Sequence, residues 1–167
     1  RSLRGKSLEL RLKVKKEGDE LIGIPTDIEL MGSYIRRMFR KGIDYVEDSF
    51  QAECRDMKVI IKPFMITRNK VSRAIRNELR RRAREFLEGR LKTRNAQEIF
   101  TEIITNKIQK ELSLKLKKIY PLALCEIRMF KILGSKEQAK EQKDEKNIIN
   151  NIDEELEKKQ DIEVDAK

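Results

Sequence analysis

The sequence has 167 residues, of which 41% are charged and 38% are hydrophobic, which is typical of one domain with a thin core and an extension. There is no apolar run near the roughly 18 residues that span a bilayer, and no signal peptide is visible, so we expect a cytoplasmic protein. The sequence lacks histidine, a glycine-rich phosphate loop and a nucleophile elbow, and this argues against an enzyme.

The charge is unevenly distributed along the chain. Residues 1–133 carry 32 Lys or Arg and 18 Asp or Glu, a net charge of +14, whereas residues 134–167 carry seven Lys and eleven acids, a net charge of −4. We therefore predict a basic folded domain over residues 1–133 and a charged acidic tail over 134–167. The composition of the tail predicts disorder, apart from one short amphipathic helix. A basic domain favours a polyanionic partner, either nucleic acid or an anionic membrane.

The first elements in chain order are two strands and a helix. Residues 7–14 alternate leucine or valine with charged residues, which predicts a half-buried strand. A second short strand is expected at 21–24, ended by Pro25. The spacing of Thr26 and Glu29 matches a capping box and predicts a helix that continues to Gly42.

The middle of the chain predicts a β-hairpin with a tight link at Arg55–Asp56. Its two arms are residues 43–54 and 57–67, and Pro63 predicts an edge or a bulge in the second arm. Cys54 and Cys125 lie far apart in the sequence. We favour two reduced cysteines in strands over a disulfide, and two isolated cysteines do not make a metal site.

The second half of the domain is mainly helical. Ser72 is a candidate N-cap for a helix that ends at about Glu88, before Gly89, and a break is expected around residues 91–95. The apolar spacing from Ala96 to Ile119 fits one helix or two, and residues 122–133 read as a final strand. The fold class predicted by these elements is α+β.

Six arginines fall in the segment 73–86, which reads RAIRNELRRRAREF. At about 100° per residue, Arg73, Arg76, Arg80 and Arg84 form one stripe roughly 80° wide. The acids of the segment lie on another flank, where they can pair with Arg81 and Arg82. A stripe of unpaired guanidinium groups favours a phosphate-contacting surface over a solvated face. The narrow apolar face, at Ile75, Leu79 and Phe86, fits a domain core better than a membrane surface.

The segments together resemble a ribosomal protein family of the archaeal and eukaryotic small subunit, called S-three-A-e or S-one-e, and the archaeal members most closely. The resemblance lies in IELMGSYIRRMFRKGID, FMITRNKVSRAIRNELRRRAREFL and KKIYPLALCEIRMFKIL, in that order. It implies an α+β fold with a β-sheet or barrel-like core and helices packed outside. The family pattern has a basic and aromatic segment before the first strand that this sequence lacks.

The resemblance implies a structural, non-catalytic constituent of the small-subunit platform that supports translation on the cytoplasmic ribosome. The implied partners are small-subunit ribosomal RNA and neighbouring ribosomal proteins, with no cofactor, metal, membrane or small-molecule substrate. The residues carried over as RNA-binding are all basic and lie in the matching segments: Arg36, Arg37, Arg40, Arg68, Lys70, Arg73, Arg76, Arg80, Arg84, Lys117, Lys118 and Arg128.

A different class of function stays open at this point. The long amphipathic helices, with the stripe from Ile99 to Leu116, and the acidic tail would also suit an adaptor that binds partner proteins. Few aromatic residues interleave with the basic ones, so contacts to phosphate are expected to dominate over base stacking.

Overall fold

A computed structural model describes residues 7–135. Its ten elements follow one another as β1 (Leu8–Glu17), β2 (Glu20–Leu30), α1 (Gly32–Met38), β3 (Tyr45–Glu47), β4 (Phe50–Glu53), β5 (Met57–Thr67), α2 (Arg73–Thr93), α3 (Ala96–Ile104), α4 (Lys107–Leu116) and β6 (Leu122–Ser135). The predicted α+β class is confirmed. The predicted helix in the acidic tail lies outside the described residues.

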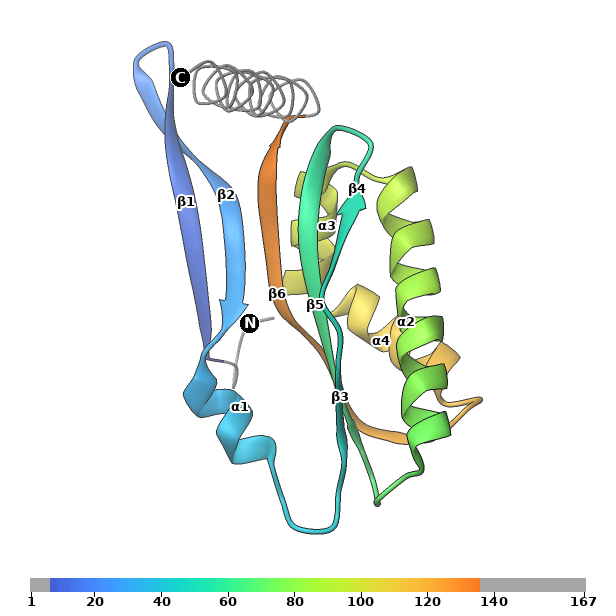
Figure 1. Cartoon of the computed structure of the whole chain (residues 1–167). Coiled ribbons are helices and arrows are strands. Elements are labelled where there is room, and N and C mark those ends of the chain that lie inside the picture. Colours follow the sequence, from blue (N-terminus) through green and yellow to red (C-terminus); the bar gives the residue numbers. More distant parts are fainter. Residues whose placement is uncertain (1–6, 136–167) are drawn as a thin grey trace, which may run out of the picture. The chain divides into compact units, whose positions relative to one another are not determined.

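The strands form one six-stranded antiparallel sheet (Figure 1). Its order is β1-β2-β6-β5-β3, and β4 also pairs with β5. Strand β6, the last strand among the described residues, therefore lies between two strands that come much earlier in the sequence. The pairing of β2 with β6 thus joins the β1–β2 hairpin to the rest of the sheet, and β3 forms an edge of the sheet.

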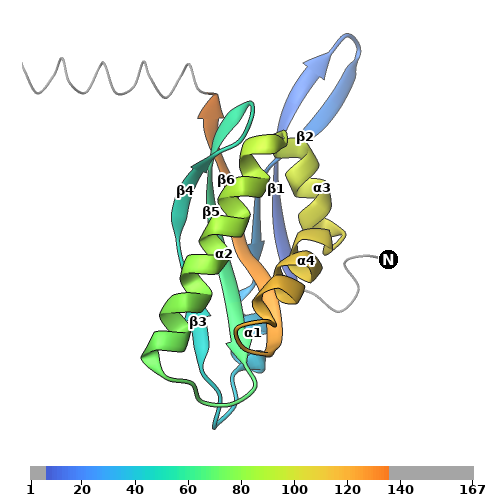
Figure 2. The same ribbon diagram turned by 90° about the vertical axis from the view of Figure 1, so that its right-hand side faces the viewer.

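The two faces of the sheet are covered by different helices. Helices α2, α3 and α4 lie on one side, and α1 lies on the other (Figures 1 and 2). Alternation along β5 shows the division, because Ile61 and Met65 belong to the larger core under α2–α4, whereas Phe64 and Ile66 pack with α1. The core is therefore divided by the sheet into a large and a small cluster.

The β1–β2 hairpin is largely exposed to solvent. Its loop is the two-residue pair Gly18–Asp19, and Gly18 has φ of 64°, as the first central position of a type II′ turn requires. Leu8 is half-buried as expected and packs against the core, but Leu12 and Val14 are exposed, at 54% and 65%. The expectation was wrong for these two residues because their part of β1 and β2 extends beyond the pairing with β6, which covers residues 27–29 only.

The predicted helix from Thr26 to Gly42 was also wrong in its first half. Residues 26–30 continue β2, and Pro25 does not end that strand, because it lies at a register shift opposite Leu12 and beyond the pairing with β6. The hydroxyl of Thr26 donates to the Arg11 carbonyl at 3.2 Å instead of capping a helix. Helix α1 is correspondingly short.

The hairpin of β4 and β5 is confirmed, with Glu53 opposite Lys58 across the predicted tight link. Pro63 lies where the partner strand is interrupted, since β3 pairs with residues 64–66 and β4 with residues 58–61. A proline has no N–H to donate, so the break in the ladder occurs where no donor is lost.

The helices differ from expectation at their ends. The Ser72 hydroxyl accepts from the Ile75 N–H at 3.4 Å, which confirms the N-cap, but α2 continues past Gly89 to Thr93 because Leu91 is buried in the core. The open question of one helix or two after Ala96 is answered by Asn106, whose φ of 62° separates α3 from α4. Strand β6 runs two residues past the predicted domain boundary at residue 133.

The two cysteines are free and buried, Cys54 just after β4 and Cys125 in β6. Burial, together with the neighbouring Glu126, raises the pKa of the Cys125 thiol to about 12. Because the thiolate is the reactive form, we expect Cys125 to resist iodoacetamide at pH 8 in the native state and to react in urea. Mass spectrometry of the alkylated peptides measures this, and rapid native labelling of Cys125 would contradict its burial.

Candidate nucleic-acid interface

Basic residues are concentrated in two segments of the chain, residues 31–43 and 68–73. These segments contain no Asp or Glu. We call their cationic residues the basic end: Arg36, Arg37, Arg40, Lys41, Arg68, Lys70 and Arg73. The first segment is α1 and the loop that follows it, and the second is the turn from β5 into α2.

The pairing of β3 with β5 brings these two segments together. At the end of this ladder, the Thr67 N–H donates to the Asp44 carbonyl at 2.9 Å, and the buried Thr67 hydroxyl donates to the same carbonyl. The Asp44 carboxylate accepts from the Val71 N–H at 2.9 Å, which ties the second segment to the first. The loops therefore lie together at the lower end of the views in Figures 1 and 2.

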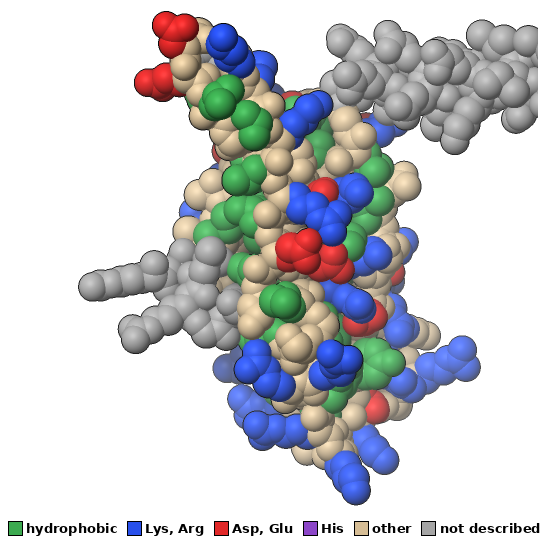
Figure 3. Space-filling model, turned by 90° about the vertical axis from the view of Figure 1, so that its left-hand side faces the viewer, with side chains coloured by type: hydrophobic (Ala, Val, Ile, Leu, Met, Phe, Trp, Pro, Cys, Tyr) green, Lys and Arg blue, Asp and Glu red, His purple; other side chains and the backbone are tan. Residues whose placement is uncertain are grey.

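All seven side chains of the basic end are exposed. Tyr34 and Ile35 of α1 are buried, so Arg36 and Arg37 on the same helix face solvent. Arg37 lies 5.8 Å from the Tyr34 ring centroid and donates to the Ser7 hydroxyl at 3.4 Å. Within residues 7–135, no ion pair involves any of the seven. Figure 3 shows Lys and Arg side chains gathered over the lower half of the face that carries α1.

Two of the four arginines in the predicted stripe on α2 bond to β3 and the loop that follows it. Arg80 donates through Nε to the Glu47 carbonyl at 3.0 Å, and Arg84 makes a bidentate pair with Asp48 at 3.1 and 3.2 Å. Arg76 is half-buried, and its buried Nε has no hydrogen-bond partner among the described residues. Arg73, the first residue of the helix, is the exposed member of the stripe without such contacts.

Helical geometry explains why this stripe is close to the core. On the scale that places Arg73 at 0°, the buried residues Leu87 and Leu91 fall at about 320° and 0°, inside the sector of the arginines. The apolar face of α2 is thus broader than Ile75, Leu79 and Phe86 indicate. The arginines at its border reach across to edge strand β3 and the loop beyond it.

The other arginines of α2 are paired with acids. Arg82 bonds to Glu78 as expected and also to Glu85, whereas Arg81 pairs with Glu78 at 2.7 Å rather than with Glu85. The hydrogen bond from Arg81 is the main cause that lowers the pKa of Glu78. At the C-terminal end of α2, Arg90 and Arg94 both pair with the buried carboxylate of Glu102. These cations are not available to phosphate as isolated charges.

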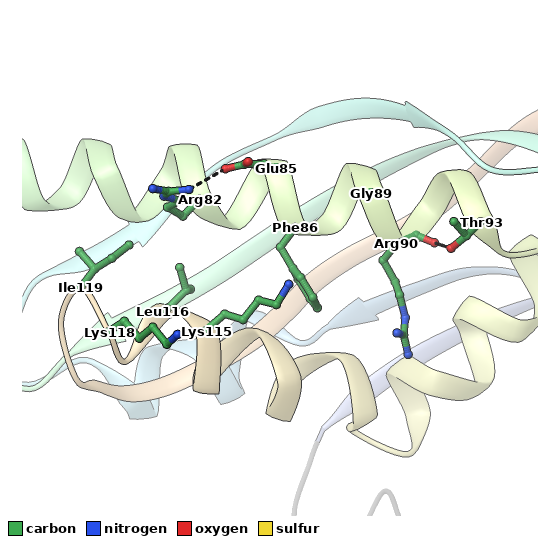
Figure 4. Close-up of a pocket in the computed structure, with 10 residues that line it drawn as sticks. All are labelled: Arg82, Glu85, Phe86, Gly89, Arg90, Thr93, Lys115, Leu116, Lys118 and Ile119. Carbon is green, nitrogen blue, oxygen red and sulfur yellow. Dashed lines mark hydrogen bonds and ion pairs between the residues drawn. The ribbon is translucent and has the colours of Figure 1, made fainter.

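Three further predicted residues lie on other elements. Lys117 and Lys118 are exposed just after α4, and Lys118 lines a groove of ≈ 740 Å³ between α2 and α4. In this groove the ammonium group of Lys115 lies 4.5 Å from the Phe86 ring centroid (Figure 4). Arg128, from β6, pairs with Glu47 at 2.9 Å on the face of α1.

Two aromatic residues at the basic end were missed as site candidates. Phe39 and Tyr45 are 41% and 52% exposed and line a hollow together with Arg36 and Arg128. The alternation of Tyr45, Val46 and Glu47 along β3 was the available signal, because a buried Val46 sends both neighbours to the opposite face.

The described residues give no indication of a metal centre or a membrane span. Within residues 7–135, no group of three or more Cys, Asp or Glu side chains could hold a metal ion. None of the helices in this range is long and apolar enough to cross a bilayer.

Residues 4–136 match the sequence profile of the Ribosomal S3Ae family. The chain belongs to this family. The predicted resemblance is thereby confirmed, and membership of a ribosomal protein family agrees with the predictions of a non-enzymatic protein and a cytoplasmic, ribosomal location. The matching segment contains both parts of the basic end and all of the described strands and helices.

Archaeal relatives in the family carry the name small ribosomal subunit protein eS1. That of Methanothermobacter thermautotrophicus is 27% identical over 139 residues, which cover 80% of this chain and 71% of the relative. That of Nanoarchaeum equitans is 27% identical over 104 residues (62% and 52%), and that of Saccharolobus islandicus strain L.S.2.15 is 26% identical over 121 residues (72% and 58%). The aligned part thus spans about half to seven tenths of these relatives.

Proposed function

We propose that this protein is a structural constituent of the small ribosomal subunit that binds ribosomal RNA through its basic end and supports translation. The observation that carries the proposal is the set of seven exposed cations, without an acid in either segment and without an ion pair in the described part of the chain. Such unpaired charge is compensated when phosphates lie across it.

The other residues that were predicted to bind RNA have a secondary role in this proposal. Lys117, Lys118 and Arg128 extend the cationic surface beyond the basic end. Arg80 and Arg84 hold α2 against β3 and the loop after it. In this proposal Arg80, Arg84 and the half-buried Arg76 contact RNA at its margin through their remaining N–H groups. The platform of the small subunit, as implied by the family resemblance, is the proposed location, with residues 1–133 as the RNA-binding domain and residues 134–167 as an acidic tail.

Neighbouring ribosomal proteins are the second class of partner in the proposal. The β1–β2 hairpin offers a surface for them, because its exposed leucines and Val14 give an apolar face away from the basic end. The alternative of an adaptor that uses the stripe from Ile99 to Leu116 loses its support, since Ile99, Leu112 and Leu116 are buried in the core.

The salt dependence of RNA binding tests this function. If each of the seven cations of the basic end neutralises one phosphate, log K for a small-subunit RNA fragment falls with log salt at a slope of about −5 to −6. Fluorescence anisotropy of the full chain with labelled RNA between 50 and 300 mM KCl measures this slope. A flat response contradicts the proposal, as do nuclease-resistant pull-downs that contain proteins but no ribosomal RNA.

A further inference from the structure

A hollow of ≈ 320 Å³ opens at the basic end, on the face of the sheet that carries α1. Its walls come from two consecutive elements and one distant strand: Ile35, Arg36 and Phe39 from α1 and its C-cap, Tyr45 and Glu47 from β3, and Arg128 from β6. We call it the α1–β3 pocket. It lies on the same face as the cations in the lower half of Figure 3, where apolar side chains are exposed among them.

Two aromatic rings in this pocket are exposed but held in position. The Phe39 and Tyr45 ring centroids are 5.0 Å apart with an interplanar angle of 77°, and Phe39 also packs edge-on against Phe64 at 5.9 Å. Phe64 is 1% exposed, so the pair is anchored on the core. Such a ring pair presents a pre-formed apolar surface, on which a flat ligand can stack without the cost of ordering the side chains.

The polar groups of the pocket complement a nucleotide. Arg36 is exposed and has no ion pair among the described residues, and Arg40 and Lys41 follow Phe39 directly in the chain. The side chains of Arg128 and Glu47 form a pair that leaves them 40% and 36% exposed. The pocket therefore combines an aromatic surface, guanidinium donors, one carboxylate acceptor and adjacent cations for a phosphate.

We propose that the α1–β3 pocket binds an unpaired nucleotide of ribosomal RNA, with the base against Tyr45 and Phe39 and its phosphate at Arg36. This inference rests on the proposed function and specifies the RNA feature that is recognised. A base inside a duplex cannot enter such a pocket, because its faces are covered by its stacked neighbours, whereas a base in a loop, bulge or end can. The stacking surface adds to the phosphate contacts and is independent of salt to first order.

Replacement of both rings by leucine, as Phe39→Leu with Tyr45→Leu, tests the inference in the full chain. The probes are a single-stranded RNA heptamer with a central 2-aminopurine and a duplex of similar charge. The wild type is expected to quench 2-aminopurine fluorescence on binding. The double variant should lose this quenching and bind the heptamer on the order of tenfold more weakly, while its duplex affinity and its salt slope stay unchanged. Phe86→Leu, a change of a ring on the other side of the sheet, is the matched control.

The outcomes separate this inference from the proposed function. If the heptamer binds without quenching in the wild type, or if the double variant quenches and binds as the wild type does, the pocket does not stack a base, even when salt-dependent RNA binding persists. Equal losses for heptamer and duplex would also overturn it, because they indicate a general disturbance of the basic end. If Phe39→Leu disturbs folding, as seen by circular dichroism, the Tyr45→Leu single variant and the quenching by the wild type still show whether the pocket stacks a base. Cross-links from Tyr45 to proteins alone in assembled subunits would assign the pocket to a protein neighbour.

Discussion

Replacement of Leu79 by alanine is expected to lower the free energy of unfolding by about 2–5 kcal/mol. Leu79 is 0% exposed in α2, which packs against β3, β4 and α4. Truncation removes the transfer free energy of the lost methyl and methylene groups, and it leaves a cavity between helix and sheet that rigid strands cannot close. Urea unfolding followed by circular dichroism measures the change.

Leu114→Ala is the matched control for this prediction. Leu114 also lies within a helix, α4, but is 68% exposed, so the same chemical change is made outside the core. Since the gain in helix propensity is similar at both sites, the difference between the two variants isolates burial. We expect Leu114→Ala to change stability by no more than about 0.5 kcal/mol. Equal effects at the two positions would mean that this face of α2 is not part of the core.

Leu79 could be placed in the core from the sequence because helical periodicity is local. The same holds for the N-cap at Ser72 and for the alternation that predicts β4 and β5. Each of these signals involves residues within a few positions of one another. Whether the long apolar pattern after Ala96 is one helix or two depends on the single left-handed residue Asn106, which periodicity does not reveal.

The start of the first helix was predicted wrongly because the local sequence matches a helix cap, whereas pairing with a distant strand stabilises a strand there. Thr26 and Glu29 match the spacing of a capping box, yet Ile28 and Leu30 also alternate as they would in a strand, and both are 3% exposed. The pairing of Ile28 with Phe130, about a hundred residues later, favours the strand. If a helix began at Thr26, this part of β6 would have no strand to pair with on that side. No short window of the sequence contains both Ile28 and Phe130, so local patterns cannot reveal this pairing.

The candidate site shows the same division between local and distant information. The family resemblance pointed to every cation of the basic end except Lys41, but their assembly depends on the pairing of β3 with β5. On α2, periodicity gave the correct angles for the arginine stripe. It could not show that Arg80 and Arg84 reach Glu47 and Asp48, since those residues lie on another element.

Charge reversal at the basic end is expected to have the largest effect on RNA binding. The variant combines Arg36→Glu, Arg40→Glu, Lys70→Glu and Arg73→Glu, all at exposed positions. Each phosphate contact contributes about 0.7–0.9 to the salt slope, which corresponds to roughly sixfold in affinity at 0.1 M salt. The loss of four contacts therefore weakens binding on the order of a thousandfold and reduces the slope by about three. Anisotropy titrations with a small-subunit RNA fragment measure both quantities.

The fold should tolerate these four changes. None of the four side chains has an ion pair in the described part of the chain, and an acid at Arg73 lies in the first turn of α2, where the helix dipole favours negative charge. The urea midpoint of the variant should therefore remain close to that of the wild type. Loss of RNA binding together with loss of cooperative unfolding would show damage to the fold rather than to an interface.

A second quadruple variant separates the position of the charges from their number. Arg55→Glu, Lys92→Glu, Lys107→Glu and Lys110→Glu make the same change in net charge at exposed positions on the β4–β5 link, α2 and α4. These cations act on RNA through the long-range field, which salt screens within about 8–10 Å, so we expect less than a tenfold loss. If both variants lose affinity equally, binding follows net charge, and the basic end is not the interface. If the first loses far more, the seven clustered cations make the contacts with phosphate.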